Sequence, residues 1–227
     1  MTFALPDDLA PELYPLAWLV GTWAGHGVID YPDIPAADFR QEMSFTHDGG
    51  PYLNYTSTIT TTGMDGEVGQ VWSVESGFWR VAPRTPDGID LKDFQHPLEV
   101  VMADAAGLVA VYVGAVGNGR IDLATDLMAR TESAAEVNAA TRLYGNVRGE
   151  LMWAWDLAAF GHELQSYASA RLSRVADATG ALVDDGGPES AAGLAAADPG
   201  ADTADDATAS PTTAGPTTAS PTTETNE

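Results

Sequence analysis

Apolar and polar residues alternate with a period of two along most of the chain up to about residue 174. Such alternation is typical of β-strands that bury one face, because successive side chains of a strand point to opposite sides. The clearest runs, bounded by Gly, Asp, Asn or Pro, cover 52–60, 69–81, 98–102, 108–114, 120–128, 142–148, 150–157 and 164–174. Before the first strand, residues 12–20 are expected to form a short helical turn.

The connections between these runs are short. Residues 103–107 join two of them, Asn118-Gly119 opens a further turn, and 146–149 connect the two runs before the last strand. Since no second long helix interrupts them, nine or ten strands predict an all-β fold, either an antiparallel sandwich or an up-and-down barrel. A barrel of this size can close its edges and still keep an internal cavity.

The composition changes near Val175. The residues that follow are mainly Ala, Asp, Gly, Thr and Pro, and three Pro-Thr-Thr units lie near the end of the chain. Such a segment buries too little apolar surface to offset the entropy of ordering it. We therefore predict a folded barrel over 1–175 and a disordered acidic tail over 176–227, which serves solubility or, as the alternative, an interaction.

The formal net charge of −23 narrows the choice of partners. All ten Lys and Arg residues lie at or before Arg174, so the charged residues of the tail are all acidic. An acidic surface repels phosphate groups, so we expect neither a nucleic acid nor an anionic membrane as a partner. No apolar run is long enough for a transmembrane helix, and the first eight residues lack signal-peptide features. The absence of Cys excludes disulfides and fits a cytoplasmic protein.

A glycine-rich motif opens the first predicted strand. Gly21, Trp23, Gly25 and Gly27 form the pattern G-x-W-x-G-x-G. Glycines at alternate positions leave one face of the strand bare, so that a neighbouring strand, a large ring or a ligand can approach closely. Trp23 is expected to plug one end of the barrel. Lipocalins and fatty-acid-binding proteins carry a related, shorter G-x-W, so this part of the motif supports an architecture rather than a function.

With this motif, further segments resemble the nitrobindin family. Glu75-Ser76-Gly77-Phe78-Trp79-Arg80 is similar to the family's E-S-G-[FY]-[FW]-R, and Leu164-Gln165 is similar to its L-Q before the last strand. The resemblance covers about residues 12–175. It continues, in the family's order, at Tyr31, Pro32, Phe39, Glu42, Phe45, His47, Gly49, Pro51 and Tyr55.

The resemblance implies a ten-stranded antiparallel β-barrel like that of fatty-acid-binding proteins and lipocalins, with a wide cleft. In nitrobindins this cleft holds ferric haem b, which binds nitric oxide and converts peroxynitrite to nitrate. The axial ligand of the iron is a histidine on the last strand, in a segment like L-Q-P-H-L. We expect the protein to be a monomer or a homodimer.

This chain departs from the family at that histidine. The matching segment reads Leu164-Gln165-Ser166-Tyr167-Ala168, and no histidine follows His162. Without the coordinate bond, a haem loses the contact that fixes its position and its reactivity. We therefore predict no haem cofactor and no catalytic residues. Tyr167 then occupies the axial position without binding iron, and the barrel binds another hydrophobic small molecule or no ligand.

The alternative is a functional ferric haem protein in which Tyr167 or His162 replaces the histidine. Tyrosinate ligates haem in catalase, but a phenol needs a basic partner to lower its ordinary pKa of ~10. Arg171 is expected on the same strand face as Tyr167, about 13 Å away. His162 is expected in a solvated loop, roughly 16 Å from Tyr167 along the chain.

The other histidines are weaker candidates. His26 lies inside the glycine motif, His47 is expected to be a structural hydrogen-bonding residue, and His96 lies beside Pro97 in an insertion-like loop that begins near Pro83. Their spacing does not match that of metal ligands, so we predict no metal site.

Two carboxylates, Glu42 and Glu75, are the ones expected to face inward. Two inward carboxylates are compatible with acid–base catalysis, but pairing with an arginine is the preferred interpretation. The arginines available for pairing are Arg80, Arg142 and Arg171. On the penultimate strand, Trp153 and Trp155 alternate with smaller or polar residues and are expected to line one face of the core.

Overall fold

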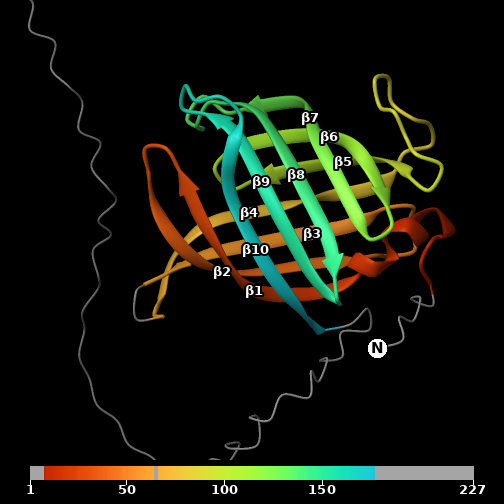
Figure 1. Ribbon diagram of the computed structural model, residues 1–227, viewed down its shortest axis with the longest axis horizontal. Coiled ribbons are helices and arrows are strands. Elements are labelled where there is room, and N and C mark those ends of the chain that lie inside the picture. Colours follow the sequence, from red (N-terminus) through yellow and green to blue (C-terminus); the bar gives the residue numbers. More distant parts are fainter. Residues whose placement is uncertain (1–7, 64–65, 177–227) are drawn as a thin grey trace, which may run out of the picture. The chain divides into compact units, whose positions relative to one another are not determined.

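The computed structural model describes residues 8–63 and 66–176 of the chain (Figure 1). The predicted acidic tail lies outside these residues, beyond Ala176. No helix in the described part of the chain has the length and apolar character needed to span a membrane.

A short 3-10 helix and ten strands make up the barrel. In chain order they are η1 (Pro11–Leu19), β1 (Gly21–Tyr31), β2 (Ile34–Thr46), β3 (Leu53–Thr62), β4 (Val68–Val81), β5 (His96–Asp104), β6 (Leu108–Gly117), β7 (Arg120–Arg130), β8 (Val137–Val147), β9 (Glu150–Ala159) and β10 (Gln165–Ala176). Each strand pairs antiparallel with the next, and β10 pairs with β1, which closes the sheet. The predicted ten-stranded antiparallel barrel is confirmed.

The alternation seen in the sequence places one residue in two inside the barrel. Along β3, Leu53, Tyr55 and Ile59 are buried, whereas Thr56 and Thr58 between them are exposed. Burial of a large apolar side chain contributes about 1.5–3 kcal/mol relative to leaving it in water. This repeated burial explains why a chain with little helical pattern forms a single closed sheet.

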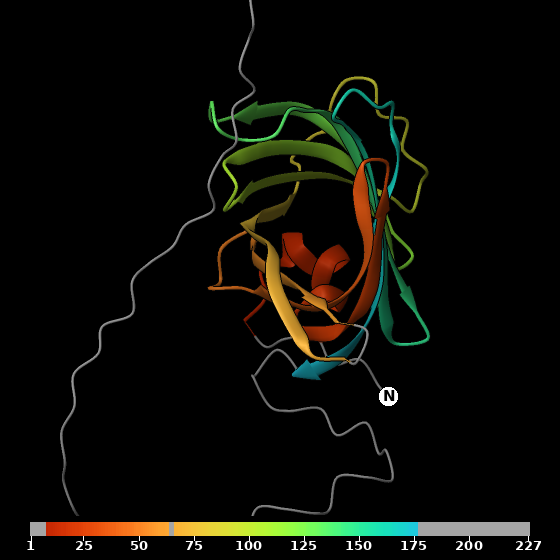
Figure 2. The ribbon, with the colours of Figure 1, turned by 90° about the vertical axis from the view of Figure 1, so that its left-hand side faces the viewer.

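The helix η1 closes one end of the barrel. Figure 2 shows η1 within the ring of strands, and its residues Leu13, Leu16 and Leu19 are fully buried. Trp23 lies beneath it and donates a hydrogen bond from Nε1 to the Leu19 carbonyl at 2.7 Å. The Arg174 guanidinium lies 4.1 Å from the centre of the Trp23 ring and donates to the carbonyls of Trp18 and Val20. The predicted role of Trp23 as an end plug agrees with these contacts.

The bare face of the glycine motif is occupied by a neighbouring strand and a ring. A Cβ atom on Gly25 would lie 2.2 Å from the Arg171 carbonyl oxygen of β10. On Gly27 it would lie 2.3 Å from Phe39 Cζ and from the Ser169 carbonyl oxygen. Both distances are far below van der Waals contact, so these glycines permit β1 and β10 to pack closely.

Among the irregularities of the sheet, one β-bulge on β4 and one on β10 interrupt the regular alternation. On β4, Ser73 lies opposite Ile59 and Val71 lies opposite Thr60, so Trp72 is an extra residue without a partner on β3. On β10, Ser166 lies opposite Asp156 and Ala168 opposite Trp155, so Tyr167 is an extra residue in the same sense. A bulge turns a side chain away from the face that its position in the sequence would give it.

Candidate functional site

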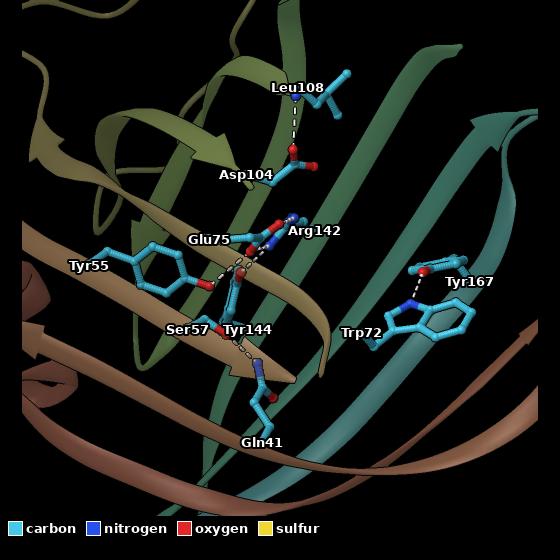
Figure 3. A network of polar contacts seen from close by, with 10 residues as sticks. All are labelled: Gln41, Tyr55, Ser57, Trp72, Glu75, Asp104, Leu108, Arg142, Tyr144 and Tyr167. Atoms are coloured by element: carbon cyan, nitrogen blue, oxygen red, sulfur yellow. Dashed lines mark hydrogen bonds and ion pairs between the residues drawn. The ribbon is translucent and has the colours of Figure 1, made fainter. Parts of the chain in front are cut away.

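Tyr167 lies inside the barrel, among aromatic side chains. It is 8% exposed, and its ring is 4.8 Å from that of Trp155 and 5.7 Å from that of Tyr31, both in edge-to-face contact. Its hydroxyl accepts a 2.7 Å hydrogen bond from Nε1 of Trp72 (Figure 3). Four aromatic side chains from β1, β4, β9 and β10 therefore meet at this point.

The phenol of Tyr167 stays protonated in this environment. Burial raises its pKa above the ordinary value of 10.0, although the hydrogen bond from Trp72 acts in the opposite direction. Arg171 does not lower this pKa as a close basic partner would, because the prediction that both residues share a strand face is wrong. The bulge at Tyr167 changes the alternation, so Arg171 is exposed on the outer face, where it binds Glu150.

His162 lies near this aromatic group without reaching Tyr167. Its Nε2 is 2.9 Å from Oδ2 of Asp33, and its ring packs edge-on against Tyr31, with 5.9 Å between the ring centres. The Tyr31 ring thus contacts both His162 and Tyr167. His162 follows β9 in a turn, as expected for a loop residue.

The other three histidines are weaker candidates for a metal ligand than His162. His26 and His96 are exposed. His47 follows the end of β2, and its buried Nδ1 has no hydrogen-bond partner among the described residues, so the expected structural hydrogen bond is not seen at that atom. Among the described residues, no three His, Asp or Glu side chains form a group suited to a metal ion.

A buried ion pair crosses the interior beside the aromatic group. Arg142 of β8 donates from Nη2 to Oε1 of Glu75 at 2.5 Å and from Nη1 to Oε2 at 2.9 Å (Figure 3). The Tyr55 hydroxyl donates to the same Oε2 at 3.2 Å, and Arg142 Nη1 also lies 3.4 Å from the Tyr144 hydroxyl. The two charges therefore neutralise each other away from water.

Of the two carboxylates predicted to face inward, one does so and the other does not. Glu75 is buried and paired with Arg142, as expected. Glu42 is exposed on β2, so its predicted inward position is wrong: it lies opposite Ala24 and Thr58, on the outer face of a regular ladder. Arg80 pairs with Glu99 on the surface.

Burial, and to a smaller extent the charges of the ion pair, shift the pKa values of the tyrosines around it. Burial, and then the negative charge of Glu75, raise the pKa of Tyr55 well above its ordinary value. Burial raises the pKa of Tyr144 to about 12 despite the opposing charge of Arg142. Burial likewise raises the pKa of Tyr112. At neutral pH these residues are therefore neutral hydrogen-bonding groups around one neutralised pair.

Trp153 and Trp155 line the interior face of β9, as predicted. Trp153 donates from Nε1 to Oε1 of Gln41 at 2.7 Å, and Gln41 donates to the Ser57 hydroxyl at 2.9 Å. The ring of Trp155 lies 3.9 Å from the guanidinium carbon of Arg142. Trp155 thus joins the ion pair on one side to Tyr167 on the other.

The space beside the buried ion pair is small. The space lined by Glu75, Tyr112, Arg142 and Trp155 measures about 10 Å³. A larger open groove, about 750 Å³, lies between residues 87–95 and the wall formed by β6 to β9, and its lining does not include Tyr167. Neither space is lined by Tyr167 or Trp72.

Sequence reasoning missed Trp72. In a regular strand, Trp72 would lie on the face opposite to Glu75 and Trp79, which points to solvent. The hydrophobic pattern of the sequence does not reveal the bulge that turns Trp72 toward Tyr167. The two residues are also 95 positions apart, so no local pattern connects them.

Comparison with known proteins places the chain in a family. The model of a "THAP4-like, heme-binding beta-barrel domain" matches residues 12–174. A "Ferric nitrobindin-like protein" of Beutenbergia cavernae is 50% identical, over 78% of this chain and 100% of the relative. A "Peroxynitrite isomerase" of Clavibacter michiganensis subsp. michiganensis is 40% identical, over 75% of this chain and 98% of the relative. The crystal structure of Rv2717c from M. tuberculosis has 30% identity and a TM-score of 0.61, over 73% of this chain and 98% of that one.

These matches correct one prediction and confirm another. The expectation of no cofactor is wrong, because the matching family model describes a haem-binding barrel. The resemblance carried by the glycine motif and by residues 75–80 is confirmed by the family match and by relatives that cover three quarters of the chain. The chain belongs to the nitrobindin family of haem-binding β-barrels.

Proposed function

We propose that this barrel binds a flat, apolar small molecule beside Tyr167, without a histidine bond to an iron atom. It therefore does not carry out the reaction for which its peroxynitrite isomerase relatives are named. The observation that carries the proposal is the hydrogen bond between Trp72 and Tyr167, the residue at which the resemblance to nitrobindins implies the axial histidine.

The residues at this position do not fit a haem iron held by histidine. The haem chemistry of this fold needs an iron with one firm protein ligand and one open face. Here the corresponding side chain is a phenol whose pKa is raised by burial, and its oxygen already accepts a hydrogen bond from Trp72. His162 is held by Asp33, with the Tyr31 ring packed against it, so it does not supply the missing ligand.

The same residues suit a flat apolar ligand. The indole of Trp72 is 40% exposed and lies against Tyr167, so it occupies the space that such a ligand would take. Trp155 and Tyr31 contact Tyr167 edge-on and supply aromatic walls. Displacing a partly exposed indole costs less free energy than displacing a fully buried one, because less buried apolar surface becomes exposed to water.

A hemin titration tests the absence of a histidine bond. Wild-type protein should give a broad Soret band that does not saturate at one equivalent, and His162→Ala should leave that spectrum unchanged. The double variant Trp72→Ala/Tyr167→His, which supplies the imidazole and frees its space, should give a sharp band that saturates near one equivalent. Trp72→Ala/Tyr167→Phe is the matched control without a ligand.

The competing function is a ferric haem protein with a substitute ligand. It requires a sharp, stoichiometric Soret band in the wild type that is lost in Tyr167→Phe or in His162→Ala. Either result would overturn the proposal and identify the ligand.

Binding of an apolar molecule is tested separately, with free indole as the probe. Trp72→Ala should bind indole because the deleted side chain leaves a space of that shape, as apolar cavities made by truncation do. The control Phe78→Ala, which removes an aromatic ring that is 53% exposed on β4 and so leaves no enclosed space, should not bind indole with comparable affinity. Equal affinity of both variants, measured by equilibrium dialysis, would contradict a site beside Tyr167.

A further inference from the structure

Two buried hydrogen-bond donors near Tyr167 lack partners. Nε of Arg142 and Nε1 of Trp155 have no hydrogen-bond partner among the described residues, and the two residues are only 6% and 9% exposed. Buried donors are almost always paired in folded proteins, so each unpaired one calls for an acceptor. Both residues line the same small space, together with Glu75 and Tyr112.

The charge of the surroundings decides what kind of acceptor fits. Both terminal nitrogens of Arg142 already bind the two oxygens of Glu75, so the positive charge is neutralised. A second anion would add an unbalanced negative charge beside Glu75 in a medium of low dielectric, which is strongly unfavourable. A hydroxyl oxygen also accepts hydrogen bonds, but it brings a proton that needs an acceptor of its own, and the nearby Glu75 oxygens already accept from Arg142 and Tyr55. A neutral oxygen without a proton, such as a carbonyl, is left.

The position of Trp155 links this space to the proposed ligand site. Its ring is 3.9 Å from the Arg142 guanidinium carbon and 4.8 Å from the Tyr167 ring. A flat molecule that displaces Trp72 therefore lies next to Trp155, and an oxygen at its inner edge reaches toward the unpaired donors. The space of about 10 Å³ is comparable to what one water molecule requires.

We infer that the ligand of this barrel is a flat apolar molecule with a neutral carbonyl oxygen at its buried end, received by Arg142 Nε and Trp155 Nε1. The inference rests on the proposed function and specifies its ligand class. It assigns Arg142 a second role besides its ion pair, and it makes Trp155 a specificity-determining residue.

Three small molecules of one shape provide the test. Fluorene has no oxygen, 9-fluorenone adds one carbonyl oxygen, and fluorene-9-carboxylate adds an anion. By equilibrium dialysis at pH 7, the wild type should bind 9-fluorenone about tenfold more tightly than fluorene, as expected for one or two new hydrogen bonds in a buried site. Fluorene-9-carboxylate should bind more weakly than fluorene.

The variant Trp155→Phe removes one donor and keeps an aromatic ring. The preference for 9-fluorenone should fall to about threefold, while fluorene affinity changes little, since only one of two donors is lost. Trp18→Phe is the matched control, because it removes another buried indole nitrogen without a partner, outside this space. Its preference should equal that of the wild type. Unchanged far-ultraviolet circular dichroism confirms the fold of both variants.

The outcomes separate the two proposals. Equal binding of fluorene and 9-fluorenone by the wild type would overturn the donor site and leave the apolar site standing, since a bound water then satisfies the donors permanently. An unchanged preference in Trp155→Phe would also overturn it. If none of the three molecules binds, both proposals fail.

Discussion

Nε1 of Trp72 lies 2.7 Å from the hydroxyl of Tyr167, and this hydrogen bond joins β4 to β10 across the barrel interior. Both residues are the extra residue of a β-bulge. In each strand the bulge turns this side chain toward the other one, whereas regular alternation would give it a different orientation. The contact therefore depends on two local irregularities, 95 residues apart, that meet only in the closed sheet.

The first prediction concerns the strength of this bond. Trp72→Phe and Tyr167→Phe each remove the same hydrogen bond and should each lower the free energy of unfolding by about 1 kcal/mol. The double variant should lose little more than either single one, giving a coupling energy on the order of 1 kcal/mol in a double-mutant cycle. Urea denaturation at pH 7 measures all four proteins. Fully additive losses would show that the two side chains do not interact.

The buried ion pair should be sensitive to the loss of one partner. Glu75→Gln leaves the Arg142 charge buried without its counter-ion and should lower the free energy of unfolding by about 3–5 kcal/mol. Glu75→Gln/Arg142→Gln should lose less than Glu75→Gln, because no unpaired charge remains. As the control, Glu99→Gln breaks the exposed pair with Arg80 and should cost less than about 1 kcal/mol.

Stability should fall at alkaline pH. The raised pKa values of Tyr55, Tyr112 and Tyr144 mean that the folded state holds these protons more tightly than the unfolded state. Their contribution is complete below pH 10 and is lost as the pH rises from 10 toward 12. Each tyrosine contributes a slope of at most about 1.4 kcal/mol per pH unit.

Urea unfolding at several pH values above 9 measures this slope. Tyr144→Phe should reduce it, whereas Tyr14→Phe, at an exposed position outside the core, should leave it as in the wild type. A slope that is the same in the wild type and in Tyr144→Phe would contradict the assignment.

Close packing of β1 against β10 should make Gly25 intolerant of a side chain. Gly25→Ala places a methyl group 2.2 Å from a backbone oxygen of β10, so backbone must shift, and we expect a loss of about 2 kcal/mol or more. Gly145→Ala on β8 is the matched control, because its nearest neighbour is a side-chain carbon at 3.9 Å. Thermal unfolding should show a lowered midpoint for Gly25→Ala only.

Most of the fold could be predicted from the alternation of apolar and polar residues and from the residues at the turns. Alternation in segments such as 53–62 and 150–159, with Gly and Asn at the turns, predicts strands because buried and exposed side chains must alternate on a pleated sheet. Short connections then predict antiparallel neighbours, and closure removes exposed edges. Glu75 was expected inside on this pattern, and it is buried.

The candidate site was predictable only in part. Tyr167 was singled out by resemblance to the family's last strand, and the structure shows it buried inside the barrel. The predicted faces of Arg171 and Glu42 failed for different reasons. The bulge at Tyr167 reverses the alternation before Arg171, whereas Glu42 belongs to a regular ladder whose exposed face only the pairing reveals.

The sequence alone therefore determined a closed antiparallel barrel and its glycine motif, because period-two burial and local turn residues are properties of neighbouring positions. The tertiary structure decided that Trp72 meets Tyr167, that Arg142 pairs with Glu75, and that two donors beside Trp155 lack partners. These relationships join residues from distant strands, and their register depends on bulges that the hydrophobic pattern does not record.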